Sequence, residues 1–420
     1  MRVRDLFLNY ACRKLGGEVS LRLVFWDGDV FDFAPNPRVT VTLRTPRLLR
    51  LLLTGDMAGL GGAYVAGDVT VDGRLREILV TGIGLAERLG QTPLFKRVAP
   101  LLARRSSHNK AHDAAAVRYH YDVSNDFYAL WLDRHMVYSC AYSANGDENL
   151  DTAQEQKLDH LCRKLRLRPG ERLLDIGCGW GGLICWAAAN YGVEAVGITL
   201  SLPQAEYARQ CVAEQGLANR VEVRCADYRD LDSEACFDKI VSVGMYEHVG
   251  TRNLPLYLGV IERQLKPGGL ALNHGITSGD RDGRTHGPPG GEFIDRYVFP
   301  GGEVPHLSKL IYEMAGARLE LLDVEDLRPH YPQTLLRWVE RLERQREKAV
   351  AAAGEPAYRI WSMYMMGMAY AFDRGWLSVA QILAAKPLGG DPAPRPWTRA
   401  YQYDPSSDVS LSAPLDWRIS

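Results

Sequence analysis

The chain has 420 residues, of which 46% are hydrophobic and 24% are charged, and its formal net charge is −1. This length favours two domains, and the composition is that of an ordinary globular protein. The near-zero net charge excludes the basic surplus that nucleic-acid binding normally requires, so we expect no nucleic-acid partner.

The cysteines and the apolar stretches indicate where the protein works. Eight cysteines are scattered without a CxxC pair or a metal-ligand cluster, as expected of reduced thiols in the cytoplasm. The N-terminal MRVRDLFLNYACRK lacks the apolar stretch of a signal peptide, and the apolar runs at 48–53 and 361–372 are too short to span a bilayer. We therefore expect a cytoplasmic protein without a metal site, peripheral on the inner face of the membrane.

Residues 1–105 are predicted to form a small α+β domain associated with lipid or membrane. The stretch 21–45 alternates like paired strands around a DG turn, a leucine-rich helix follows over 46–57, and 61–73 is predicted as a second strand-and-turn stretch. The basic segment 96–110 (KRVAPLLARRSSHNK) leads out of this domain, and we place a linker at 106–116. This segment is either a solvated connection or a patch that attracts anionic headgroups.

The pattern changes at residue 117 to alternating strands and helices. ERLLDIGCGWGG is an apolar strand that runs into a glycine-rich turn, and four further strands are predicted in VEAVGITLS, RVEVRCADY, FDKIVSVGM and GLALNHGIT. Such alternation predicts a mostly parallel, doubly wound sheet over 117–386. Ligands of such sheets bind at the carboxyl ends of the strands. Residues 387–420 are predicted to be an irregular tail.

The ends of the first three strands carry candidate nucleotide contacts. Asp175 precedes the glycine loop, whose residues let the backbone approach a ligand closely. Asp227 follows the third strand, where it is placed to accept from an adenine amino group. The second strand ends in Thr199 rather than in the acid that usually binds the ribose of NAD, which leaves Thr199 and Gln204 as polar contacts. This order, with a later KPGG, is typical of a class I Rossmann-like S-adenosylmethionine methyltransferase; a structural turn in another α/β enzyme is the alternative.

The motifs HYDVSNDFYALWL, MVYSCAY, LLDIGCGWGG, GITLSLPQ, DYRDL, MYEHVG, LNHGITS and HYPQTLLRW follow one another in this order. With them the chain resembles the cyclopropane fatty acid synthases and their relatives, the mycolic acid methyltransferases, over about 117–386. GGAYVAGDVTVDG also resembles the first domain of the enzymes that act on acyl phospholipids. The resemblance implies transfer of a methylene or methyl group from S-adenosylmethionine to the cis double bond of an unsaturated membrane phospholipid, giving a cyclopropane fatty acyl chain.

The resemblance also assigns site residues by position. For S-adenosylmethionine it implies contacts from Tyr138, Ser139, Gly177, Gly179, Thr199, Gln204, Tyr228 and Gly244. For a bound bicarbonate ion that acts as the general base, it implies a catalytic pocket of Cys140, Glu247, His274, Ile276 and Tyr331. In that pocket Glu247 would accept from the bicarbonate hydroxyl, and the other four would hold the remaining oxygens, Cys140 and Ile276 through nearby backbone N–H groups.

Each catalytic candidate also has a structural interpretation. Cys140, His274 and Tyr331 could be packed core residues, and Glu247 could be an acid favoured at a helix start. His120, Tyr121 and Asn125 either border the site or belong to a segment that caps the following helix.

Two positions depart from the family pattern. Gly62 stands where relatives usually have a glutamate. His306 stands where they have a serine, in a stretch expected to line the acyl channel, so it could change the choice of substrate or product.

Other functions remain open at this stage. A different fate of the substrate cation would give a methyl-branched, methylene or furan-precursor lipid. A small-molecule N-methyltransferase and a silent lipid-binding protein are further alternatives, although the first domain and the intact pocket favour a lipid enzyme. The sequence leaves a homodimer open.

Overall fold

The computed structural model describes residues 3–15, 19–54, 56–89, 124–231, 236–281, 291–299, 302–389, 391–404, 406–407 and 409–411. The chain divides into two compact units, each built from several segments. The first comprises 1–107, 287–300 and 338–370, and the second comprises 108–286, 301–337 and 371–420. The linker predicted at 106–116 lies outside the described residues, as do His120 and Tyr121.

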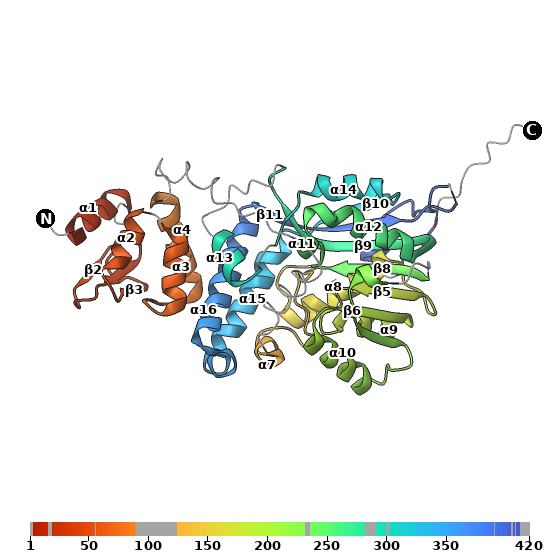
Figure 1. The fold of residues 1–420 in the computed structure, drawn as a ribbon, viewed down its shortest axis with the longest axis horizontal. Coiled ribbons are helices and arrows are strands. Elements are labelled where there is room, and N and C mark those ends of the chain that lie inside the picture. The colour runs from red at the N-terminus through yellow and green to blue at the C-terminus, as the bar shows by residue number, and fades with distance from the viewer. Residues whose placement is uncertain are drawn as a thin grey trace, which may run out of the picture. The chain divides into compact units, whose positions relative to one another are not determined.

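The first unit contains a four-stranded sheet with the order β2-β1-β3-β4 (Figure 1). Its strands are β1 Leu21–Val24, β2 Val30–Asp32, β3 Val39–Leu43 and β4 Val69–Asp72. β1 and β2 form the antiparallel pair predicted around the DG turn, whereas β1 and β3 run parallel. The helices are α1 Val3–Leu15, α2 Arg47–Thr54, α3 Met57–Ala66 and α4 Leu75–Leu89. Leu21 and Leu23 of β1 pack with Leu48 of α2 in one apolar core, which confirms the α+β class.

The prediction of a strand-and-turn stretch at 61–73 is wrong over its first half, which belongs to α3. The Asp56 side chain accepts the Gly59 N–H at 2.8 Å and caps the start of this helix. Gly67 ends it in the left-handed region at a φ of 85°, and its N–H bonds back to the last turn. The helix therefore depends on its two caps, because the glycines inside it oppose it. Only β4 forms the expected strand.

Two further helical regions belong at least in part to the first unit. α13 Gly291–Tyr297 contacts α3, where Phe293 lies so close to Gly61 that a Cβ there would be 2.8 Å from its ring. α16 Arg346–Asp373 breaks at Gly354, which has a φ of 83° and precedes Pro356 by two residues. Beyond this break, Arg359 donates to the carbonyl oxygen of Tyr64 at 2.9 Å. Both helices therefore hold α3 in place.

The second unit is built on a seven-stranded sheet with the order β10-β11-β9-β8-β5-β6-β7. Its strands are β5 Arg172–Ile176, β6 Glu194–Thr199, β7 Val221–Cys225, β8 Phe237–Val243, β9 Leu265–Ser278, β10 Glu320–Asp326 and β11 Leu377–Ala385. β5 to β9 are mutually parallel and confirm the predicted doubly wound sheet. β10 and β11 add an antiparallel edge.

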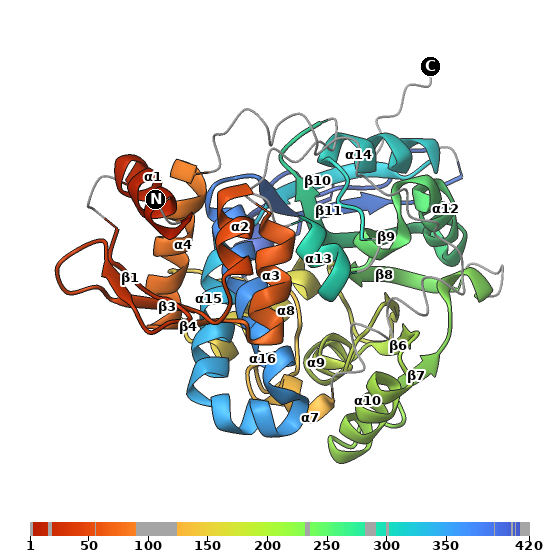
Figure 2. The ribbon, with the colours of Figure 1, turned by 60° about the vertical axis from the view of Figure 1, so that its left-hand side comes forward.

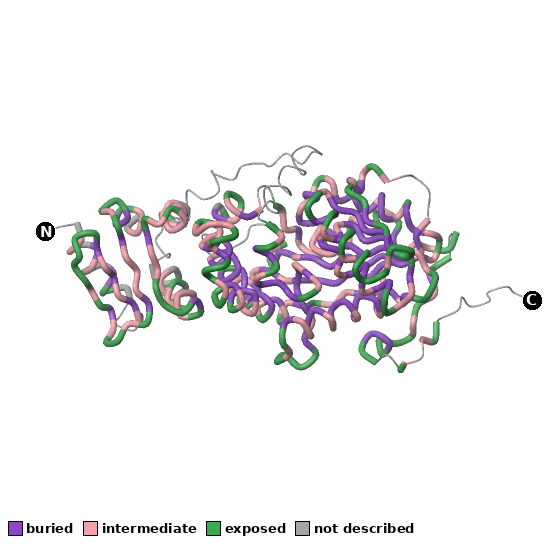
Figure 3. Tube along the Cα trace, turned by 90° about the horizontal axis from the view of Figure 1, so that it is seen from below, coloured by how far each residue is buried: buried purple, intermediate pink, exposed green. Residues whose placement is uncertain are grey.

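Helices cover both faces of this sheet (Figures 1 and 2). α8 Leu150–Lys164, α9 Gly182–Tyr191 and α10 Leu202–Glu214 lie on one face, and α12 Leu254–Gln264 and α14 Leu307–Gly316 lie on the other. Successive strand residues point to opposite faces, so Leu173 joins the core under α8 and α9 while Leu174 joins the core under α12. The buried residues accordingly run along the strands (Figure 3).

The connections of β5 position the candidate site. β5 pairs in parallel with β6 on one side and with β8 on the other, so the chain leaves the centre of the sheet in opposite directions. A crevice forms at the carboxyl ends of strands where the order reverses in this way. The short helices α11 Tyr246–Val249 and η2 Tyr228–Asp230 follow the strands at this edge.

Two smaller findings complete the fold. The tail predicted to be irregular contains the short helix α17 Ala400–Tyr403, in which Gln402 is buried. Within the described part of the chain, no helix combines the length and the apolarity that crossing a bilayer requires.

Candidate active site

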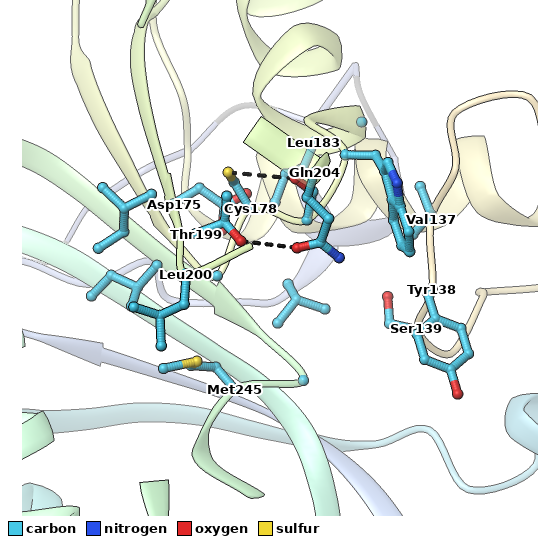
Figure 4. A pocket seen from close by; sticks show the side chains of 18 of the residues that line it. Val137, Tyr138, Ser139, Asp175, Cys178, Leu183, Thr199, Leu200, Gln204 and Met245 are labelled. Carbon is cyan, nitrogen blue, oxygen red and sulfur yellow. Dashed lines mark hydrogen bonds between the residues drawn. The ribbon is translucent and has the colours of Figure 1, made fainter. Parts of the chain in front are cut away.

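A pocket opens at the carboxyl ends of β5, β6 and β8 in the second unit (Figure 4). Its wall comes from the loop after β5, the ends of β6 and β8, the start of η2, and the segment 136–139. All residues predicted to bind the cofactor line it except Asp227: Tyr138, Ser139, Asp175, Gly177, Gly179, Thr199, Gln204, Tyr228 and Gly244. The structure therefore brings together residues that lie more than a hundred positions apart in the sequence.

The glycine loop turns the chain from β5 into α9. Gly177, Gly179 and Gly181 have φ values of 86°, 55° and 87°, which side-chain-bearing residues rarely adopt. At Gly179 an added Cβ would meet no atom within 4 Å, so its backbone conformation rather than lack of space requires glycine. The loop thereby presents bare backbone to the pocket.

Thr199 and Gln204 are already oriented toward each other. The Thr199 hydroxyl donates to Oε1 of Gln204 at 2.9 Å, and it accepts the Ser201 N–H at 3.2 Å. Ser201 also caps α10, which begins at the next residue. This arrangement fixes the Gln204 amide and leaves its nitrogen toward the pocket (Figure 4).

Asp227 occupies a different place from the other predicted contacts. Its chain neighbours Ala226 and Tyr228 line the pocket. Both of its carboxylate oxygens, however, accept from the Arg229 side chain, at 2.9 and 2.7 Å. Arg229 itself lines the pocket and packs over the Tyr228 ring. The predicted role as an adenine acceptor therefore competes with an ion pair.

Lys157 of α8 is a pocket residue that the sequence analysis missed. Its side chain is 1% exposed, and its Nζ donates to the Ser139 hydroxyl at 2.8 Å. Burial lowers its pKa to about 8. The available signal was its spacing, because it lies four residues from both Ala153 and Leu161 on the buried face of the helix. Lysine is rarely buried on an apolar helix face unless its charge has a partner, so this position indicates a paired or ligand-binding lysine.

Asp175 faces the same pocket from the end of β5. It is 2% exposed, and its Oδ1 has no hydrogen-bond partner among the described residues. Burial raises its pKa to about 7, against the opposing effect of the Lys157 charge.

Glu247 and Ile276, two of the predicted catalytic residues, are in direct contact. Glu247 lies on α11 and is 8% exposed, and its Oε1 accepts the Ile276 N–H at 2.6 Å. Its Oε2 has no hydrogen-bond partner among the described residues. Burial raises the pKa of this carboxyl group to about 7. The Ile276 N–H that was predicted to hold an anion therefore donates to Glu247 in this structure.

His274 projects from the same face of β9 as Ile276, two residues away. It is fully buried, and its Nδ1 lies 3.2 Å from Nε2 of Gln381 on β11. Burial, with the Lys157 and Lys164 charges, holds its pKa well below the usual range, so the ring is neutral. Gln381 is a second residue that the sequence analysis missed, within FDRGWLSVAQIL.

Cys140 and Tyr331 are connected to this group through intervening residues. Burial raises the pKa of the Cys140 thiol, which is 1% exposed and donates to the carbonyl oxygen of Ala141 at 3.2 Å. The Ala141 N–H donates to Thr334 on α15 His330–Arg344, the helix that also carries Tyr331. The Tyr331 ring packs on Phe372 with the ring centroids 4.5 Å apart.

A second path connects the Cys140 segment to β9. The Cys140 Sγ lies 4.0 Å from the carbonyl oxygen of Leu327. The Leu327 N–H donates to the carbonyl oxygen of Val379, which pairs with Ile276 across β11 and β9. These contacts link the Cys140 segment to β9, whereas Tyr331 shares only the helix α15 with Thr334. None of the five predicted catalytic residues is among those that line the cofactor pocket, and their shared role stays a prediction.

A family model described as "Mycolic acid cyclopropane synthetase" matches residues 108–382. The chain is 49% identical to the "Probable fatty acid methyltransferase" of Pseudomonas putida, over 92% of this chain and 96% of that protein. It is 34% identical to the "Cyclopropane-fatty-acyl-phospholipid synthase" of Escherichia coli K12, over 82% of this chain and 87% of that protein. The structure of mycolic acid cyclopropane synthase CmaA1 with SAH and CTAB matches with a TM-score of 0.62 and 34% identity, over 65% of this chain and 98% of that one.

Proposed function

Because this chain belongs to the mycolic acid cyclopropane synthetase family of S-adenosylmethionine-dependent methyltransferases, we propose that it transfers a one-carbon unit to the cis double bond of an unsaturated phospholipid acyl chain and closes a cyclopropane ring there. The name of the similar Escherichia coli protein supports a phospholipid substrate. That similarity covers 82% of this chain, which is more than the segment 108–382 that the family model matches.

The residues around the cofactor pocket suit this chemistry. The sulfonium of S-adenosylmethionine, when bound, supplies an electrophilic methyl group. An alkene is a weak nucleophile, so it must be held close to that methyl, and the substrate cation that results must be kept from water. Tyr138 and Trp180 line the pocket, and Tyr128 packs against both, with centroids 5.8 and 4.9 Å away. We expect the Tyr138 and Trp180 rings to keep water out and to offer faces that stabilise a cation.

The observation that carries the proposal is the buried carboxyl group of Glu247. Its Oε1 is held by Ile276, while its Oε2 has no hydrogen-bond partner among the described residues. A buried acceptor of this kind is costly unless a ligand donates to it. The hydroxyl of a bicarbonate ion fits that requirement, and bicarbonate would supply a base for the proton that ring closure releases. Glu247 would orient it, and His274 and Tyr331 would be the further donors that the family resemblance implies.

A second candidate function differs from the first in the lipid product. The similar Pseudomonas putida protein, at 49% identity, is named a fatty acid methyltransferase rather than a cyclopropane synthase. A hydride shift in the substrate cation, followed by loss of a proton, would instead give a methylene lipid or a methyl-branched lipid that keeps a double bond. This candidate requires the same cofactor pocket and differs only in the base and the acyl channel.

Membrane association is part of the proposal. A phospholipid double bond lies in the apolar interior of a bilayer, so a protein must bind the surface to reach it. We propose peripheral binding on the cytoplasmic face through the basic segment 96–110, which lies outside the described residues.

Lipid analysis tests the function. The protein is expressed in a host that makes unsaturated phospholipids but has no cyclopropane synthase of its own, with the Glu247→Gln variant as the control. We expect wild type to add one CH2 to the unsaturated acyl chains and to give the upfield proton signals of a cyclopropane. A CH2 gain with a branched-methyl signal would establish the second candidate, and unchanged lipids would contradict both.

A further inference from the structure

Two oppositely charged side chains line the cofactor pocket without pairing with each other. Lys157 reaches it from α8 and Asp175 from the end of β5, and they are 1% and 2% exposed. Nζ of Lys157 makes a single hydrogen bond, to the uncharged hydroxyl of Ser139. Oδ1 of Asp175 makes none among the described residues.

This arrangement is costly unless a ligand completes it. A buried ammonium group has three N–H donors, and burial without a charged partner strongly disfavours it. The nearby carboxylate of Asp133 is committed elsewhere, because its oxygens accept the backbone N–H groups of His135 and Val137 at 2.9 Å. Lys157 thus has donors to offer to a ligand, and Asp175 has an acceptor.

Arg229, a second basic residue of the pocket wall, differs from Lys157 in this respect. Its guanidinium group pairs with both carboxylate oxygens of Asp227. Lys157 makes no ion pair of this kind among the described residues, and the carboxylates of Asp133 and Asp175 act on its charge only from beyond ion-pair distance. The α-carboxylate is the one anionic group of S-adenosylmethionine, so it matches a lysine. The α-ammonium group beside it matches a carboxylate side chain such as that of Asp175.

We propose that Lys157 binds the α-carboxylate of the methionine part of S-adenosylmethionine, while Asp175 faces the α-ammonium group. The two side chains form a receptor for an amino-acid zwitterion, and Ser139 orients the lysine toward it. The inference rests on the class of cofactor alone and is independent of which lipid product the enzyme makes.

The structural alternative is that Lys157 serves only to hold the segment 137–140 through Ser139. Another side chain already does this, because Nε2 of Gln154 donates to the carbonyl oxygens of Val137 and Ser139, at 3.3 and 2.9 Å. The two roles differ in what they predict for ligands that lack the carboxylate.

Calorimetry with two ligands separates these roles. Decarboxylated S-adenosylmethionine keeps the adenosine, the sulfonium and the ammonium but lacks the carboxylate. We expect wild type to bind it about 10- to 100-fold more weakly than S-adenosylmethionine, the range for a buried charge-assisted hydrogen bond. Lys157→Met should bind the two ligands with nearly equal affinity, because the group that distinguishes them is gone.

One further variant and a third ligand serve as controls. Lys157→Gln keeps a donor for Ser139 without the charge and should also lose the preference. 5′-Methylthioadenosine, which lacks the whole amino-acid part, should bind wild type and the Lys157 variants within about twofold.

Three results would overturn the proposal. The first is a wild type that binds both sulfonium ligands equally, which requires no variant. The second is a Lys157 variant that still prefers S-adenosylmethionine over its decarboxylated form. The third is a Lys157 variant that loses as much affinity for 5′-methylthioadenosine as for S-adenosylmethionine. None of these measurements involves lipid, so their failure is distinct from failure of the proposed reaction.

Discussion

Lys157, Asp175 and Glu247 are ionisable side chains that the fold removes from water, and burial shifts the pKa of each toward neutrality. The pKa of Lys157 falls to about 8, and those of Asp175 and Glu247 rise to about 7. Groups with such pKa values gain or lose their charge with small changes in surroundings, and they concentrate at functional sites. A bound ligand can therefore set the charge of each one.

Glu247 gives a prediction about pH and turnover. The variant Glu247→Gln should lower kcat by about 100-fold or more, because an amide oxygen is a weaker acceptor and its NH2 opposes a donor. In wild type the raised pKa means that the active carboxylate form prevails above about pH 7, so kcat should fall as pH drops through that value.

Cofactor affinity is the internal control for Glu247. Calorimetry with S-adenosylhomocysteine should give nearly the same affinity for wild type and Glu247→Gln. A loss of affinity as large as the loss of rate would place Glu247 in the cofactor site. Removal of dissolved CO2 should also slow wild type, and indifference to it would argue against a bound bicarbonate.

Asp227 gives a prediction about charge. Asp227→Asn would remove the negative charge that pairs with Arg229 in the pocket wall. Affinity for the cationic S-adenosylmethionine should then fall by about tenfold, and affinity for the uncharged sulfur of S-adenosylhomocysteine should fall less. Equal losses for both ligands would instead favour the adenine contact expected from the sequence. Adding Arg229→Gln should restore the affinity for S-adenosylmethionine.

At the scale of elements, the caps of α3 offset part of the cost of its internal glycines. Asp56→Ala removes the acceptor for the Gly59 N–H, which should cost about 1 kcal/mol of stability. Asp56→Asn should cost only a few tenths, because asparagine caps helices nearly as well. Thermal unfolding of both variants measures the difference, and equal midpoints would show that the cap contributes nothing.

The elements that the sequence predicts well are those whose pattern is local. β5, β6 and β8 are short, largely apolar and mostly buried runs next to glycine or turn residues, as expected of strands covered on both faces. The glycine loop after β5 is also a local pattern, and it therefore predicted where the cofactor pocket lies. The motif order located nine of its predicted lining residues, because that order implies the positions directly.

What the sequence could not predict depends on contacts made across the fold. β11 reads LSVAQILAA, whose alanines disfavour a strand until β9 and β10 pair with it on either side. Gln381 matters only because that pairing places it opposite His274. The contact of Lys157 with Ser139 likewise forms only in the folded chain, and no local pattern reveals such a partner.

At the scale of the whole molecule, membrane binding is the property to test. Replacing Arg104 and Arg105 by glutamate should weaken binding to anionic vesicles, because each basic residue near such a surface contributes about 1 kcal/mol. Binding by wild type should also fall as salt rises. Vesicle sedimentation measures both effects, and the affinity for S-adenosylhomocysteine should stay unchanged. Equal binding of the variant and wild type would exclude this segment as the membrane contact.

These point substitutions are better suited to the question than a truncated chain. Deleting residues 1–111 should leave cofactor binding in place and remove activity on vesicles. It would also remove α3, against which Phe293 packs and whose Tyr64 accepts from Arg359. The truncation therefore changes stability and membrane binding together, whereas the arginine variants change only the second.

The segmented make-up of the first unit also has a consequence for synthesis. Its segments are 1–107, 287–300 and 338–370, so its sheet leaves the ribosome long before α13 and most of α16 exist. Domains that are contiguous in sequence can fold one after another as they emerge. Here the earliest part must wait for nearly the whole polypeptide, with the α3 surface that these helices cover exposed meanwhile. A premature stop between 300 and 338 would thus leave both units unfinished, the second without β11 and the first without α16.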